Sequence, residues 1–121
     1  METLQFSILD KLNKSRFRSS FHLNKKMKEY VYEKGIDKIN QDGIELITKR
    51  LAPSDIPNDG KQTPMKQVHP IFIAQHACAC CCRGCLEKWY HIPKGRELTK
   101  EEIINIVDIL MEWISREIKQ I

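Results

Sequence analysis

The chain has 121 residues, of which 41% are hydrophobic and 30% are charged, and its formal net charge is +4. This length suits a single domain over residues 1–121 with one hydrophobic core, and it is too short for two. No apolar run approaches the length of a bilayer span, and the first residues do not resemble a secretion signal. We therefore expect a cytoplasmic protein with no membrane partner, whose five cysteines stay reduced.

The sequence pattern of the N-terminal half predicts helices. Apolar residues recur at helical spacing over residues 3–13 and again over 36–51, where Asp42-Gly43 could split the second helix into two pieces. Asn24 is a suitable N-cap for a further helix over 25–34. These segments point to a mainly helical domain.

A basic segment covers part of this half, with seven bases and no acid between Lys11 and Lys28. Within it Arg16 and Arg18 flank Phe17, a combination that can hold a phosphate and stack on a base. Such a patch attracts polyanions by releasing their counterions, although a solvated face is the commoner origin of a charge run. The candidate residues for binding a nucleic acid or another anionic partner are Arg16, Arg18, Lys25, Lys61, Arg83, Lys94 and Arg96.

A proline-rich loop follows over residues 53–68, and it is long enough to suggest a functional role. Asp59-Gly60-Lys61 has the acid-x-lysine spacing of metal-dependent nucleases, but Asn-Asp-Gly is above all a turn former. One alternative is therefore a metal-dependent hydrolase in which Asp59, Lys61 or Arg83 acts on a phosphate substrate.

Residues 76–91 contain all five cysteines and two of the four histidines. Thiolate and imidazole are the ligands that suit zinc, and Cys82-x-x-Cys85 could supply two of the four that a structural site needs. His76 and His91 stand six residues outside this pair on either side. Cys81 is a further candidate ligand. An iron–sulfur cluster is less favoured than zinc because four thiolates would have to come from adjacent positions that point apart.

Two other interpretations of the cysteines stay open. Free cysteine is often buried as a small hydrophobic residue, so the cluster could be core filling. The Cys82–Cys85 pair could also be a redox dithiol or a disulfide, with Cys81 as an exchange partner.

Helical signals continue to the C-terminus. The apolar run over residues 69–76 is short enough for a strand, but Pro70 at a first helical position favours a helix. Another short helix is expected to start near Cys81. Thr99 and Glu102 form a capping box that opens the last helix, which is apolar over most of its circumference. That helix either crosses the middle of the domain or uses its spare face for a homodimer.

Four strings of the sequence resemble a family of small bacterial proteins known only as a domain of unknown function. They are RFRSSFHL from Arg16, NDGKQTPM from Asn58, HPIFIAQHA from His69 and CCRGCLEKW from Cys81. The resemblance covers nearly the whole chain and implies one intact domain, without an established activity or cofactor.

The family pattern bears on the choice of ligands. Threonine is common in it where this chain has Cys78 and Cys80, so the resemblance implies that these thiols are additions. Its histidine tends to follow the tryptophan directly, whereas Tyr90 stands between Trp89 and His91 here. The candidate ligands that match the pattern are His76, Cys81, Cys82 and Cys85.

We therefore expect a mainly α-helical single domain of about four to six helices, with a long central loop and a Cys/His-rich segment that binds metal. The leading hypothesis is a zinc-stabilised protein that binds nucleic acid or another anionic partner. Besides the hydrolase, the other alternative is a thiol-based sensor or protein-interaction module.

Overall fold

The computed structural model describes residues 4–119, which form helices and loops with no strand among them. The elements are η1 (Leu4–Ser7), α1 (Ile8–Asn13), α2 (Arg16–Ser19), α3 (Lys25–Lys34), α4 (Ile36–Arg50), α5 (Pro70–Ala77), α6 (Arg83–Tyr90) and α7 (Lys100–Ile118). The prediction of a mainly helical fold is confirmed, and its helices include the single turn α2.

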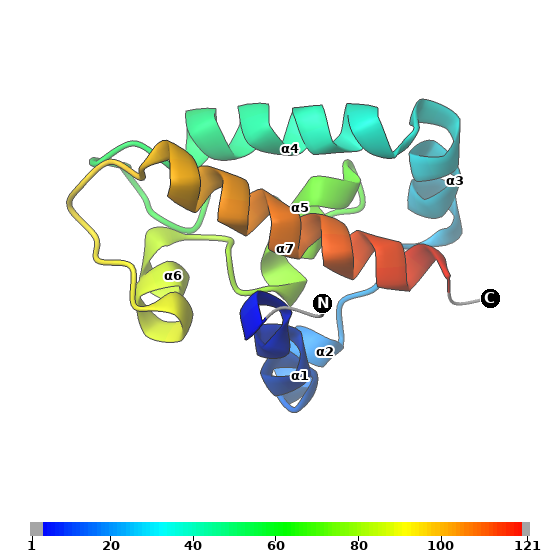
Figure 1. Ribbon diagram of the computed structural model, residues 1–121, viewed down its shortest axis with the longest axis horizontal. Helices are drawn as coiled ribbons and strands as arrows, with labels where there is room; N and C mark the ends of the chain where they lie inside the picture. The colour runs from blue at the N-terminus through cyan, green and yellow to red at the C-terminus, as the bar shows by residue number, and fades with distance from the viewer. Residues whose placement is uncertain (1–3, 120–121) are drawn as a thin grey trace.

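Helix α5 forms the centre of the fold, since all eight of its residues are buried. Helices α2, α3, α4 and α7 all contact it. In Figure 1, α7 crosses in front of α5 and α4 runs along the top of both, while α1 and α2 lie on the other side of α7 from α4. These four helices therefore pack around one buried, apolar helix.

The start of α5 explains why the apolar run from His69 is a helix. His69 is its N-cap, and the Nδ1 atom of the ring accepts a hydrogen bond from the Ile71 N–H at 3.1 Å. The other ring nitrogen lies 3.1 Å from Asp42 Oδ2, which ties the cap to α4. Pro70 occupies the first turn, where its missing N–H costs nothing. The helix expected here is confirmed.

Helix α4 runs through Asp42-Gly43 without a break, so the division considered from the sequence does not occur. Gly43 is buried at a close approach between helices. A Cβ atom at this position would lie 3.0 Å from Ile71 Cδ1 and 3.2 Å from Val107 Cγ1. Gly43 therefore lies where α4 packs closely on α5 and α7, and it is not a helix stop.

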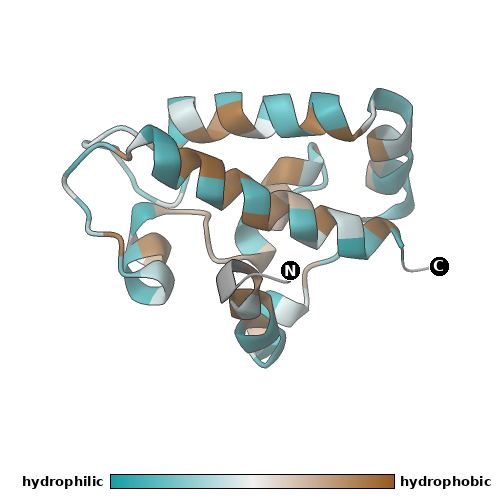
Figure 2. Cartoon of the chain, in the orientation of Figure 1, coloured by the Kyte–Doolittle hydropathy of each residue, from teal (hydrophilic) through white to brown (hydrophobic). Residues whose placement is uncertain are grey.

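Helix α7 begins with the predicted capping box of Thr99 and Glu102, and it contributes a large share of the core. Figure 2 shows its apolar residues along the side that meets α4 and α5. Ile104 is the exception, with 49% of its surface exposed. Even with this 19-residue element, residues 4–119 contain no helix that is long and apolar enough to cross a membrane.

Candidate metal centre

Three cysteine sulfurs meet at the N-terminal end of α6. Cys82 is the N-cap of this helix, and its sulfur accepts a hydrogen bond from the Cys85 N–H at 3.3 Å. This local turn brings the Cys82 and Cys85 sulfurs to 3.2 Å from each other. Cys81 precedes the cap, and its sulfur lies 3.7 Å from that of Cys85. All three sulfurs lie within 4.8 Å of one another, and the three residues form a group that could hold a metal ion.

The spacing of the sulfurs fits a tetrahedral metal site. A zinc–sulfur bond of about 2.3 Å places two thiolates of a tetrahedron about 3.8 Å apart. The separations of 3.2 Å and 3.7 Å are close to that value, so small side-chain adjustments would suffice to bind an ion. The five cysteines are free thiols. The same proximity would also allow oxidation of two of them to a disulfide.

Arg18 reaches this group from α2. Its Nη2 atom lies 3.2 Å from Cys85 Sγ, and its Nη1 atom lies 3.6 Å from Cys81 Sγ. Nη1 also donates to the carbonyl oxygen of His76 at 2.8 Å, which holds the guanidinium in place. A positive charge therefore lies directly against two of the three sulfurs, where it stabilises a thiolate.

The thiols of the group differ in acidity. A hydrogen bond with Cys85 and the nearby Arg18 guanidinium lower the pKa of Cys81 to about 7, against the opposing effect of burial. The hydrogen bond to Cys81 and burial raise the pKa of Cys85, and burial raises that of Cys82. Cys81 is therefore the first of the three to ionise, and a metal ion would have to displace protons from the other two.

Asp59, in the central loop, contacts the turn of α6 that follows Cys82. Oδ1 accepts hydrogen bonds from the Arg83 N–H at 3.0 Å and from Gln62 Nε2 at 2.9 Å, and Oδ2 accepts from the Gly84 N–H at 3.1 Å. These bonds outweigh the effect of burial and lower the pKa of the carboxyl group. Asp59 therefore caps α6 electrostatically and orders the turn that carries Cys82.

A second cation lies close to this turn. A Cβ atom at Gly84 would lie 3.8 Å from both Asp59 Oδ2 and Cys82 Sγ, and 4.0 Å from Lys94 Nζ. Lys94 also interacts electrostatically with Asp59. The metal centre thus has Arg18 on one side and Lys94 on another.

The remaining two cysteines belong to the core. Cys78 and Cys80 have no measurable exposure, and burial raises the pKa of both thiols, that of Cys80 to about 12. Their backbone carbonyls accept hydrogen bonds from Tyr90 Oη and from Gln75 Nε2 respectively. Both thiols therefore pack in the core and lie outside the group of three sulfurs.

The structure places the two candidate histidines outside the group of three sulfurs. His76 is buried on α5, stacks on the Phe21 ring and has its Nε2 atom 2.9 Å from the Thr63 carbonyl oxygen. Because a carbonyl only accepts, Nε2 carries a proton in this contact. His91 is exposed and ends α6 in a left-handed conformation. Among residues 4–119, no His, Asp or Glu joins the three cysteines as a potential ligand.

Several basic candidates are engaged within the fold. The Arg83 side chain is only 4% exposed, and its guanidinium donates to five backbone carbonyls, those of Leu51, Ala52, Pro53, Pro93 and Arg96. Arg96 in turn makes a two-bond contact with the Glu102 carboxylate at 2.7 Å and 2.8 Å. These arginines join loops to the start of α7. The candidates with exposed positions are Arg16, Lys25, Lys61 and Lys94.

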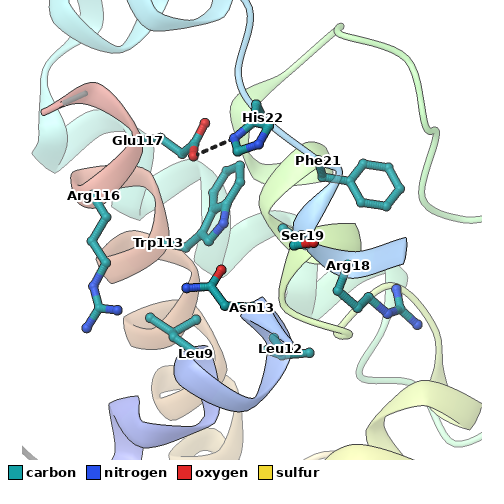
Figure 3. Close-up of a pocket in the computed structure, with 11 residues that line it drawn as sticks. Leu9, Leu12, Asn13, Arg18, Ser19, Phe21, His22, Trp113, Arg116 and Glu117 are labelled. Carbon is teal, nitrogen blue, oxygen red and sulfur yellow. Dashed lines mark hydrogen bonds and ion pairs between the residues drawn. The ribbon is translucent and has the colours of Figure 1, made fainter. Parts of the chain in front are cut away.

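A cavity of about 80 Å³ lies between α1, α2 and α7, and Arg18 lines one side of it (Figure 3). Its charged residues are paired. His22 Nδ1 lies 3.0 Å from Glu117 Oε2, and Oε1 of this buried carboxylate accepts a hydrogen bond from the Leu23 N–H at 2.9 Å. Figure 3 shows the Arg18 guanidinium directed away from this pair. The cavity is therefore a junction between helices, and Arg18 serves the sulfurs instead.

Two contributions to the centre could not be found from the sequence. The sequence places Arg18 among the candidates for anion binding, and no local signal relates it to Cys85. Thr63 lies in the central loop, and its hydroxyl donates a hydrogen bond to the Cys81 carbonyl oxygen at 2.8 Å. The Thr63 carbonyl oxygen accepts a hydrogen bond from His76 Nε2. Neither contact follows any spacing rule, because each depends on how α2 and the loop pack.

Comparison with known proteins agrees with the resemblance carried by the sequence motifs. No solved structure matches this chain. The family model described as a domain of unknown function (DUF4186) matches residues 6–115, and the chain therefore belongs to that family.

Proposed function

We propose that this protein binds one zinc ion through the sulfurs of Cys81, Cys82 and Cys85. The observation that supports this proposal is the convergence of three thiols at spacings close to those of a tetrahedral site. Zinc is favoured over magnesium or calcium because sulfur ligands select soft or borderline metals. The ion would join the segment before α6 to the helix itself and stabilise the turn between them.

The positive charge of Arg18 is a second argument for a metal site at these sulfurs. Three thiolates on a divalent ion carry a net charge of −1, which is costly in a half-buried position unless a cation lies nearby. The guanidinium contacts the Cys81 and Cys85 sulfurs, where it offsets this charge. Such hydrogen bonds to ligand atoms commonly raise metal affinity.

The test is the metal content of the reduced protein, purified without chelator and measured by elemental analysis. We expect close to one equivalent of zinc per chain. Cys82→Ser and Cys85→Ser should each lose most of this metal and unfold at a lower temperature. A metal content near zero in the unmodified protein would reject the proposal.

A second candidate function is binding of single-stranded nucleic acid, and one observation favours it. Phe17 is 53% exposed although it is a large apolar residue, and it lies between Arg16 and Arg18 in the segment without acids. An exposed ring beside cations can stack on an unpaired base while the cations meet phosphates. Arg18 is already bonded to the sulfurs, so Arg16 is the exposed cation next to the ring, and Lys25 is another exposed cation of this segment.

Titration with single-stranded and duplex DNA and RNA at low and moderate salt tests this function. We expect single-strand binding that weakens steeply with salt, since each neutralised phosphate releases a counterion. Phe17→Ala and Arg16→Ala should reduce it, while Tyr32→Ala, which removes another exposed ring on α3, should not. Absence of binding to all four polymers at low salt would reject it.

A further inference from the structure

We propose that the zinc ion takes an external low-molecular-weight thiol as its fourth ligand. This inference rests on the zinc site proposed above and names what that site would bind. The observations behind it are the all-sulfur ligand group, its partial exposure and the two cations beside it.

The ligand group sets the chemistry of the fourth position. Within the described part of the chain, three sulfurs form the group and no other potential ligand joins them. Zinc sites with three protein ligands keep the fourth position for water or a substrate, in contrast to closed structural sites. Thiolates are good ligands for zinc, so a fourth sulfur donor suits a centre that already carries three. Low-molecular-weight thiols are the small biological molecules that can supply a thiolate.

The position of the group allows such a ligand to reach it. Cys81 is buried, whereas Cys82 and Cys85 are half-buried. The ring of Phe17 is exposed, and its centre lies 5.0 Å from the carbon of the Arg18 guanidinium, which in turn contacts Cys85. A thiol that approaches past Arg18 would therefore have an exposed apolar ring nearby, suited to the hydrocarbon part of the molecule.

The charge balance explains the role of the cations. The thiol R–SH would replace a water molecule on zinc, a zinc–sulfur bond would form, and the S–H proton would leave to solvent because zinc deprotonates a coordinating thiol. No oxidation or reduction occurs. The centre would change from −1 to −2, which makes it more dependent on nearby positive charge. Arg18 lies against two sulfurs, and Lys94 lies near the turn that carries Cys82.

Cobalt substitution separates this inference from the zinc site itself. Cobalt(II) in a thiolate site has visible d–d bands and near-ultraviolet sulfur-to-metal charge-transfer bands that report the number of sulfur ligands. We expect the metal-free protein to gain these bands with one equivalent of cobalt(II). Anaerobic titration with 2-mercaptoethanol should then intensify the charge-transfer bands with saturation, whereas chloride or 2-hydroxyethyl methyl ether should leave them unchanged.

The possible results have distinct meanings. If cobalt binds but the thiol leaves the spectrum unchanged or removes the metal, the inference is wrong and the zinc site stands. If no cobalt bands form, the zinc site itself is rejected. At saturating cobalt, Arg18→Gln should weaken thiol binding about tenfold because one unit charge beside the new thiolate is lost. Lys94→Gln should weaken it less, and Arg16→Gln should not change it. Equal thiol affinity in all three variants would contradict the role given to the cations.

Discussion

The guanidinium of Arg18 lies 3.2 Å from the sulfur of Cys85, although 67 residues separate them in the chain. The contact joins α2 to the N-terminal turn of α6, and a second bond joins the same guanidinium to the His76 carbonyl at the end of α5. A residue that looks like a surface cation in the sequence is thus the charge partner of the thiol group.

Replacing Arg18 should weaken metal binding. We expect Arg18→Gln to lower zinc affinity by about 10- to 100-fold, the range seen when a hydrogen bond to a metal ligand is removed. Competition against a chromophoric chelator measures this affinity. The matched control is Arg16→Gln, which changes an exposed arginine on the same helix and should keep normal affinity. If both variants bind zinc like the unmodified protein, Arg18 does not act on the centre.

The two buried cysteines should be dispensable for metal. Cys78→Thr and Cys80→Thr should each retain about one equivalent of zinc, because neither thiol belongs to the group of three. Elemental analysis checks this, and urea unfolding reports any cost of placing a hydroxyl in the core. Loss of zinc from either variant would move the site to these residues and contradict the ligand assignment.

Arg83 should be important for stability independently of metal. Arg83→Met leaves five backbone carbonyls without their donor, and we expect a loss of about 3 kcal/mol in the free energy of unfolding. Urea unfolding of the metal-free protein gives this value. Lys88→Met removes an exposed charge from the same helix and should change stability by at most about 0.5 kcal/mol. Similar values for the two variants would show that the five bonds add little.

The Arg96–Glu102 pair predicts a specific dependence of stability on pH. Hydrogen bonding to Arg96 lowers the pKa of Glu102 from 4.5 to about 2. A depressed carboxyl pKa contributes stability that is fully present above pH 4.5 and is lost as pH falls towards 2. The difference in urea midpoint between the unmodified protein and Glu102→Gln should therefore be constant near neutral pH and shrink in this window. A difference that does not change with pH would show that the pair makes no ionic contribution.

Local patterns were sufficient for much of the fold. The Asn24 cap, the Pro70 start and the Thr99–Glu102 capping box all depend on residues within one helical turn, and each is present in the structure. The Cys82–Cys85 proximity is of the same kind, since a helix N-terminus brings these two positions together. The role of Gly43 could not be predicted in this way, because the sequence pattern is the same for a glycine that ends a helix and for one that lets another helix approach.

The sequence by itself therefore determined the longer helices, the caps of α3, α5 and α7, and the cysteine pair, because these depend on residues close together in the chain. The turn α2 and the division of residues 4–13 into η1 and α1 were not predicted. Only the tertiary structure decided which charged side chains accompany the thiols and which histidines do not. Arg18 reaches the sulfurs, and Arg83 is buried among carbonyls, because α2, the central loop and α6 pack around α5. Such contacts join residues tens of positions apart, and no periodicity or spacing in the sequence encodes them.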